Sequence, residues 1–173
     1  MVVRLSNPGD SSKILDAYLS STRSMIDSGV DQWSFNYPNI HNIEKDIQSG
    51  ISYVIEYSGK VGVIVLDEKE DDQYHKLKWP YESQKPLIIH RLAVHSELQG
   101  KGIGKRLCVF AEEVALKSGC DSIRLDAYST NQASNKLYLG LGYKKAAGYC
   151  YFHHNKFPFV CYEKRIQNVS KSS

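Results

Sequence analysis

The sequence predicts a single domain of the α/β class with a mixed β-sheet. Apolar residues recur at helical spacing in several segments, which predicts amphipathic helices. Short runs rich in β-branched and aromatic residues, bounded by turn residues, predict strands between them. The order is βααββ, then βαβα, then a hairpin, which is typical of a mixed sheet. At 173 residues the chain fits one domain, placed at residues 1–166 and followed by a polar tail at 167–173.

In the N-terminal half, the expected elements are a strand, two helices and a two-stranded hairpin, at residues 2–6, 7–29, 39–49, 51–57 and 61–66. The first helix begins at Asn7-Pro8, because proline suits the first helical position, and it ends at Gly29. Ser58-Gly59-Lys60 is the predicted hairpin turn. The charged segment 67–85 is predicted to be a solvated excursion from the fold.

In the C-terminal half, strands and helices alternate before a final hairpin, with elements at 87–94, 102–117, 122–127, 131–141, 143–151 and 158–166. The run 87–94 is apolar and β-branched, so it is a candidate for a central strand. The helix 102–117 has one apolar face, formed by Ile103, Leu107, Phe110 and Val114. Gly142 ends the second helix of this half.

The composition is that of an ordinary soluble protein, with 42% hydrophobic and 24% charged residues. A net charge of +3 gives no reason to expect nucleic acid or a membrane as a partner. The four cysteines lack the spacing of metal sites and His153-His154 has no ligand cluster nearby, so we expect reduced thiols and no metal. The first residues turn polar too soon for a secretory signal, and no apolar run has the length of a membrane span. We therefore expect a cytoplasmic protein.

A glycine-rich turn, Gln99-Gly100-Lys101-Gly102-Ile103-Gly104, joins the strand 87–94 to the helix that follows it. Its glycines let the backbone approach a ligand closely and turn N–H groups outward. The N-terminus of the helix adds free donors and a partial positive charge, which suit a phosphate. Lys101, Lys105 and Arg106 add positive charge. A tight turn with a solvated basic face is the other interpretation of this stretch.

Two other phosphate-binding motifs fit the turn less well. A P-loop would need Gly-Lys-Ser/Thr at a spacing that the chain does not have. The dinucleotide fingerprint would need a third glycine where Lys105 stands. Asp126, at the end of the next strand, is placed as a ribose-binding acid would be. A nucleotide-binding oxidoreductase therefore stays open as a weak alternative, although the final hairpin replaces the repeated βα units of that fold.

Two motifs together resemble the GNAT acetyltransferases. The turn at 99–104 is similar to the Gln/Arg-x-x-Gly-x-Gly/Ala loop of that family and follows the strand Arg91-Leu92-Ala93-Val94. A second stretch matches at residues 131–138, Asn-Gln-Ala-Ser-Asn-Lys-Leu-Tyr, followed by Leu141-Gly142-Tyr143. The resemblance covers residues 86–165 well, and the N-terminal part only in the order of elements. It implies a mostly antiparallel central sheet flanked by helices, and transfer of an acetyl group from acetyl-CoA.

The resemblance also implies roles for individual residues. Acetyl-CoA, as co-substrate, would be bound by Leu92, Ala93, Val94, Gln99, Gly100, Lys101, Gly102, Ile103, Gly104, Lys105 and Asn131. Tyr138 would be the general acid for the departing thiolate. Seven residues are close to two helical turns, which independently places Asn131 and Tyr138 on one helix face. A half-buried core tyrosine is the other interpretation of Tyr138.

His90 is the first candidate for the base that takes a proton from the amine. It lies two residues before Leu92 on the same strand, so we expect the two on one face of the sheet. The position is similar to that of a histidine in the arylalkylamine acetyltransferases of the family. A hydrogen-bonded core histidine is the other interpretation. Glu56 is the second candidate, and ordered water in place of a side chain is the third.

The acceptor is expected at the aromatic segment 31–38, with Asp31, Trp33 and Tyr37 as binding residues. Asp31 would attract a cationic amine, and the two rings would pack the acceptor or hold a cation. A helix-flanking cap at Asp31 and a hydrophobic plug are the other interpretations. We expect acetylation of a primary amine, on a small molecule or a peptide, by direct attack in a ternary complex. A catalytically silent CoA-binding regulatory module is the main alternative, and homodimerisation stays open.

Overall fold

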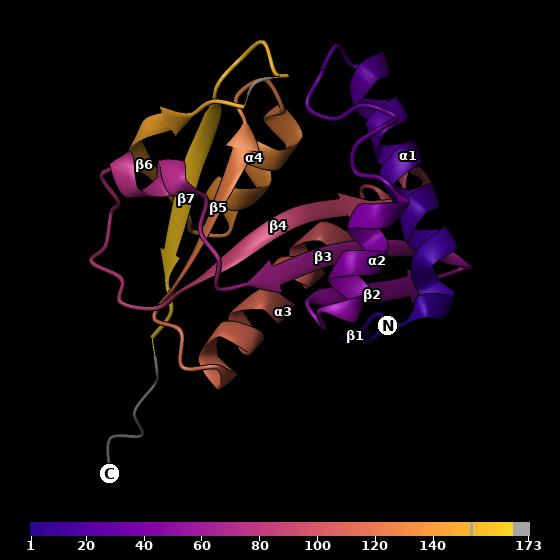
Figure 1. Cartoon of the computed structure of the whole chain (residues 1–173), viewed down its shortest axis with the longest axis horizontal. Coiled ribbons are helices and arrows are strands. Elements are labelled where there is room, and N and C mark those ends of the chain that lie inside the picture. The colour runs from indigo at the N-terminus through magenta and orange to yellow at the C-terminus, as the bar shows by residue number, and fades with distance from the viewer. Residues whose placement is uncertain (153, 168–173) are drawn as a thin grey trace.

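The computed structural model (Figure 1) describes residues 1–152 and 154–167. Its centre is one seven-stranded sheet with the order β1-β2-β3-β4-β5-β7-β6. The strands are β1 Val3–Leu5, β2 Ser52–Tyr57, β3 Lys60–Asp67, β4 Pro86–Val94, β5 Ser122–Tyr128, β6 Lys144–Cys150 and β7 Phe159–Arg165. Neighbouring strands are antiparallel except β4 and β5, which are parallel. The predicted mixed, mostly antiparallel sheet is confirmed. Residues 168–173 of the predicted tail, and His153 of the predicted histidine turn, lie outside the described residues.

Four α-helices cover the two faces of the sheet, namely α1 Ser11–Asp27, α2 Ile40–Gln48, α3 Ile103–Lys117 and α4 Gln132–Gly140. Val63 packs in a core cluster with α1 and α2, whereas its neighbour Ile64 packs in a second cluster with α3 and Tyr138 of α4. Because successive side chains of a strand point to opposite faces, the two helix pairs lie on opposite sides of the sheet. A third cluster lies on the β5–β7 part of the sheet and contains Tyr74 and Tyr128.

Local signals set the helix boundaries. Asn7 caps a 3-10 turn at Pro8–Asp10, and α1 continues from it. Asn39 caps α2, because its side chain accepts hydrogen bonds from the N–H groups of His41 and Asn42. These segments agree with the helices expected at 7–29 and 39–49. No helix among the described residues has both the length and the apolar character that crossing a membrane requires.

The parallel pair β4 and β5 stays together over a short distance. Three residue pairs are in register, of which Pro86↔Ser122 is the first and Ile88↔Arg124 the last. Beyond them the two strands separate, as Figure 1 shows. The second half of β4 therefore has a strand partner on its β3 side only, and an opening lies in the middle of the sheet.

A β-bulge interrupts β4 at this opening. His90 is opposite Val65 and Ala93 is opposite Val63, so β4 has one residue more than β3 between these pairs. Arg91 lies in the bulge with a φ of 33°. The extra residue reverses which positions of β4 face which side.

The prediction that His90 and Leu92 share a face is therefore wrong. Ile89 before the bulge and Leu92 after it both pack on the α3 side, whereas Ala93 belongs to the cluster under α1 and α2. His90 is directly opposite Val65, an odd-numbered position of β3 like Val63, so it lies on the α1 side. A strict period of two holds along a regular strand, and the bulge breaks it here.

The segment 67–85 also differs from its prediction. It contains a 3-10 turn, η2 Asp72–Lys76, in which Tyr74 is only 2% exposed. Trp79 packs against the Tyr74 ring and lies over the guanidinium of Arg124, whose centre is 4.2 Å from the ring centroid. Most charged residues of the segment are exposed as expected, but Tyr74 and Trp79, two of its three large aromatics, join the third core cluster.

Candidate functional site

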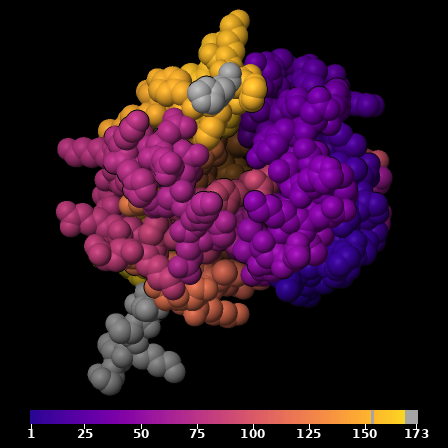
Figure 2. Space-filling model, viewed as in Figure 1, coloured from indigo at the N-terminus to yellow at the C-terminus, as the bar shows by residue number. Residues whose placement is uncertain are grey.

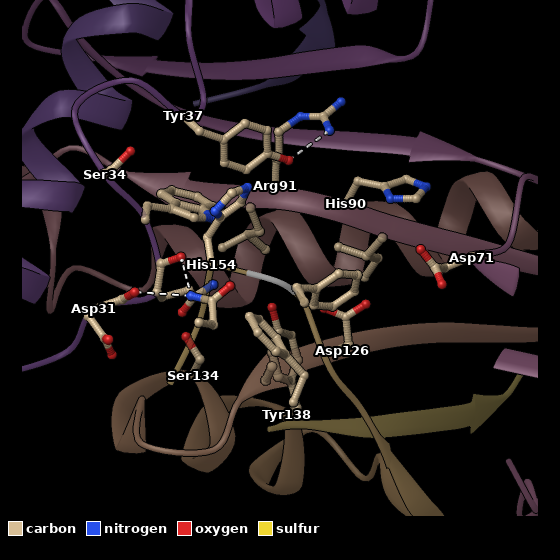
Figure 3. A pocket seen from close by; sticks show the side chains of 18 of the residues that line it. Asp31, Ser34, Tyr37, Asp71, His90, Arg91, Asp126, Ser134, Tyr138 and His154 are labelled. Carbon is tan, nitrogen blue, oxygen red and sulfur yellow. Dashed lines mark hydrogen bonds between the residues drawn. The ribbon is translucent and has the colours of Figure 1, made fainter. Parts of the chain in front are cut away.

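A cavity of about 840 Å³ lies where β4 and β5 separate. Figure 2 shows its mouth as a hollow between the N-terminal part of the chain, the segment around 67–85 and the last part of the chain. Its lining comes from the second half of β4, the end of β5, α4 and three connecting segments (Figure 3). The lining residues used below are Asp31, Trp33, Phe35, Tyr37, Lys69, Glu70, Asp71, Tyr74, His90, Arg91, Leu92, Asp126, Ser134, Tyr138, Phe152, His154 and Phe159.

Tyr138 extends from α4 into the cavity (Figure 3). It is 6% exposed, and the rings of Tyr143 and Tyr162 pack against it. Its hydroxyl has no hydrogen-bond partner among the described residues. Burial raises the pKa of Tyr138 well above its ordinary value, so the hydroxyl keeps its proton at neutral pH. Tyr138 is thus a core residue that also presents a proton donor to the cavity.

His90 lines the cavity from β4 and is held by Asp67 of β3. The distance between His90 Nε2 and Asp67 Oδ1 is 2.9 Å. Burial alone would raise the pKa of Asp67, but the hydrogen bond and the charge of His90 outweigh it and keep the pKa low. The arrangement fixes the imidazole ring beside the opening in the sheet.

The predicted acceptor residues Asp31, Trp33 and Tyr37 all line the cavity. The Tyr128 hydroxyl donates to Asp31 Oδ1 at 2.7 Å, and the side chain of Asn155 donates to the Asp31 carbonyl at 3.0 Å. The Trp33 ring packs edge-on against Tyr18 of α1, with centroids 5.5 Å apart. Trp33 therefore combines the two interpretations, since it covers the core with one side and lines the cavity with another.

Sequence reasoning missed the part that Arg91, Tyr74 and Asp126 have in this site. Arg91 donates to Asp46 of α2 at 2.6 and 2.7 Å. The Tyr74 hydroxyl donates to Asp126 Oδ2 at 2.6 Å. Only long-range pairing brings these residues to the cavity. The presence of large aromatic residues within the charged segment 67–85 was the local signal for Tyr74.

The glycine-rich turn follows β4 and contributes no residue to the lining of the cavity. Gly100 and Gly102 have φ values of 76° and 77°, in the left-handed region that glycine tolerates best. Gly102 is the N-cap of α3 and has no side chain that could occupy the cap position. Gly104 is inside the helix, where an added Cβ would be 3.4 Å from Leu137 of α4. Two of the three glycines thus shape the turn, whereas the third lies in the helix, where a Cβ would make only an ordinary contact.

Two further predicted residues, Asn131 and Glu56, also lie outside the cavity lining. Asn131 is the N-cap of α4, so its side chain is engaged in capping the helix, and its predicted contact with the pantetheine stays a prediction. Its side chain accepts from the Ser134 N–H and donates to Gln32 Oε1 at 2.8 Å. Glu56 lies on β2, two strands away from β4, and its carboxylate pairs with Lys13 at 2.6 Å. Sheet order and capping, which local sequence does not show, decide both positions.

The remaining predicted CoA residues differ in position. Leu92 lines the cavity, whereas Ala93 is buried under α1 and α2. Gln99 donates its side-chain amide to the Val94 carbonyl at 3.2 Å, and Lys101 lies over the Tyr57 ring. Within residues 1–152 and 154–167, no cluster of histidine, cysteine and acidic side chains has a metal-binding arrangement.

The site combines a bulged strand, a parallel partner strand that separates from it, and a helix capped by glycine. These features accompany similarity to known proteins. A profile of the acetyltransferase (GNAT) family matches residues 19–143, which is more than half of the chain. The chain belongs to the GNAT acetyltransferase family.

This GNAT acetyltransferase is similar to the N-acetyltransferase YesJ of Bacillus subtilis, with 25% identity over 150 residues and 83% of each chain covered. Its fold is similar to that of a GNAT-family acetyltransferase from Streptococcus agalactiae, with a TM-score of 0.78, 21% identity and 96% of each chain covered. It is also similar in fold to yncA of Salmonella typhimurium, solved with its cofactor acetyl-CoA. That match has a TM-score of 0.71 and 17% identity, and it covers 100% of this chain and 98% of the other.

Proposed function

We propose that this protein transfers an acetyl group from acetyl-CoA to a primary amine, on a small molecule or a peptide, by direct attack within a ternary complex. The observation that carries the proposal is the cavity at the separation of β4 and β5. It is reached by the Tyr138 hydroxyl from one face of the sheet and by His90 from the other. Donor and acceptor can therefore meet in the opening from opposite sides.

The turn before α3 fits the pyrophosphate of acetyl-CoA. The N–H groups of Ile103, Gly104 and Lys105 are in the first helical turn and have no acceptor within the helix. Because Gly102 caps the helix without a side chain, an anion can occupy the cap position itself. Lys101 and Lys105 are exposed beside it and add positive charge. The solved relative with bound acetyl-CoA supports the same donor.

The second half of β4 fits the pantetheine arm. Beyond Ile88 this strand has no partner on its β5 side, so its backbone groups there are available to the amides of the arm. Leu92 and Val94 pack on the α3 side, which is the side of the glycine-rich turn. A donor lying along them from the turn would bring its thioester to the cavity.

The side chains of the cavity fit the chemistry of the transfer. The amine nitrogen attacks the acetyl carbonyl carbon, the new C–N bond forms, and the C–S bond breaks. Tyr138 donates its proton to the leaving thiolate, which is general acid catalysis. The proton lost by the amine goes to His90 or to water, since an alkylamine with a pKa of about 10 arrives mostly protonated.

The test is an acceptor panel that follows the release of the CoA thiol from acetyl-CoA. We expect release that depends on an added amine, together with a product heavier by one acetyl group. A catalytically silent CoA-binding module would bind acetyl-CoA with the same affinity and release no thiol with any amine. That result, with binding shown by calorimetry, would refute the proposed reaction.

A further inference from the structure

The acceptor cavity has more negative than positive charge. Asp31, Asp71 and Asp126 line it, and none of them forms an ion pair within the described part of the chain. The lining has fewer uncompensated positive groups. Arg91 is paired with Asp46, and Lys69 is the one lysine of the described lining. His90 and His154 add charge only when they are protonated.

The fourth acidic residue of the lining is already used by the fold. Glu70 pairs with Arg124 at 2.7 Å, and Arg124 in turn pairs with the buried Glu163 at 2.9 Å. One arginine is thus shared by two carboxylates, so Glu70 is held by the fold and only partly compensated, and the acidic residues of the lining without an ion pair among the described residues are the three aspartates. A ligand of this cavity is expected to bring positive charge.

Asp126 is the aspartate best placed to meet the reacting amine. It lies near the end of β5, at the opening, where it is half-buried and lines the cavity. Tyr74 donates to its Oδ2 at 2.6 Å, while Oδ1 accepts no hydrogen bond from any described residue. Tyr74 is itself fixed, because it is 2% exposed and its carbonyl accepts from the Trp79 ring at 3.0 Å. One carboxylate oxygen is held rigidly and the other is free for a ligand.

The environment of Asp126 also favours a cation. Burial raises the pKa of Asp126, and the Tyr74 hydrogen bond and the charge of His90 oppose this rise. A partly desolvated carboxylate that lacks an ion-pair partner is stabilised when an ammonium group binds beside it. A neutral or anionic ligand would leave this desolvation uncompensated.

A second, independent feature shows that a ligand belongs here. The Tyr138 hydroxyl faces the same cavity from α4, is unpartnered among the described residues, and belongs to a side chain that is 6% exposed (Figure 3). Aromatic rings form much of the remaining wall, namely those of Trp33, Phe35, Tyr37, Phe152 and Phe159. Such rings can pack the carbon body of an amine or lie against a cation.

We propose that Asp126, positioned by Tyr74, binds the ammonium group of the acceptor, and that the acceptors are cationic amines without a carboxylate, namely alkylamines, arylalkylamines and diamines. This inference rests on the proposed acetyl transfer and names its substrate class. Tyr74 is a positioning residue in this arrangement, since it acts through Asp126. An amino acid would bring its carboxylate into a cavity that is already negative, and it is expected to be a poor acceptor.

The experiment compares matched acceptors that differ by one carboxylate, 1,5-diaminopentane against lysine and 2-phenylethylamine against phenylalanine. We expect kcat/KM to be at least about tenfold higher for the amine of each pair, because like charges oppose binding of the amino acid. Asp126→Asn keeps the shape and the acceptor for Tyr74. It should raise KM for both amines by about 10- to 100-fold and leave KM for acetyl-CoA unchanged.

Asp72→Asn is the matched control, because it removes the same charge from an exposed residue of η2 outside the cavity lining. Tyr74→Phe should give an intermediate rise in KM for the amines. Equal kcat/KM within each wild-type pair, or an amine KM in Asp126→Asn that matches Asp72→Asn, would overturn the inference while acetyl transfer stands. Absence of thiol release with every amine would instead refute the transfer. Should Asp126→Asn not fold, the wild-type ratios and Tyr74→Phe decide.

Discussion

Arg91 on β4 donates three hydrogen bonds to the carboxylate of Asp46 on α2. Nη2 donates to Oδ1 at 2.7 Å and to Oδ2 at 2.6 Å, and Nε donates to Oδ2 at 3.2 Å. The two side chains are 20% and 7% exposed. Arg91 has a φ of 33°, a backbone conformation that costs energy for any residue other than glycine. The pair fastens the bulge of β4 to α2, and the bulge places His90 and Leu92 on opposite faces of the sheet.

Breaking this pair is expected to destabilise the protein. Asp46→Asn leaves a largely buried guanidinium without its counter-charge, which should lower the free energy of unfolding by about 2–4 kcal/mol. Urea unfolding followed by circular dichroism measures the loss. Glu68→Gln is the control, because the pair of Glu68 with Lys85 is exposed on both sides and should contribute less than about 1 kcal/mol. Equal stability of the two variants would show that the pair does not hold the bulge.

Gly102→Ala is expected to weaken acetyl-CoA binding by about tenfold or more, because a Cβ disfavours the left-handed conformation and moves the first N–H groups of α3. Isothermal calorimetry with acetyl-CoA tests this. Gly119→Ala is a matched control, since Gly119 has a similar φ of 70° at the other end of α3. It should cost similar stability and leave binding alone. Gly104 is less suited to the test, because it has no positive φ and an added Cβ would make only an ordinary contact with Leu137 at 3.4 Å.

Tyr138→Phe is expected to lower kcat by about 10²- to 10⁴-fold with unchanged acetyl-CoA affinity, because the ring still packs but the proton donor is lost. Tyr143→Phe is the control, since the Tyr143 hydroxyl is also buried and unpartnered but does not line the cavity. Because burial raises the pKa of Tyr138, its ionisation should not reduce the rate below a pH of about 10. Unchanged kcat in Tyr138→Phe, in single turnovers that exclude product release, would leave Tyr138 a core residue only.

The base is tested through the pH profile of kcat/KM. If neutral His90 accepts the amine proton, the rate rises with pH as the imidazole loses its charge, and His90→Gln removes this rise. Asp67→Asn should lower kcat/KM, because the imidazole loses the carboxylate, 2.9 Å away, that fixes the orientation of its ring. Glu56→Gln is the control outside the cavity, and it should change neither the value of kcat/KM nor its rise with pH. A profile that is the same in His90→Gln as in the wild type would assign the proton to water.

Trp33→Ala is expected to raise KM for the acceptor and to lower the melting temperature, because Trp33 both lines the cavity and packs on Tyr18. Phe35→Ala separates the two effects. Phe35 lines the cavity but is 52% exposed, so it should change the acceptor KM with little loss of stability. Neither variant should alter KM for acetyl-CoA. A Trp33→Ala protein that only melts earlier would make the residue a plug over the core.

The sequence by itself determined the order of the elements and the turn at 99–104, because helix periodicity, capping residues and glycine conformations act within a few residues of each other. It also pointed to Tyr138 and to the aromatic segment 31–38. Only the tertiary structure decided which of these residues meet. The bulge at Arg91 depends on pairing with β3. The order of the strands separates Glu56 on β2 from the cavity at β4. The contact between Tyr74 and Asp126 joins residues 52 positions apart. Such contacts depend on how distant segments pair and pack, which no local pattern records.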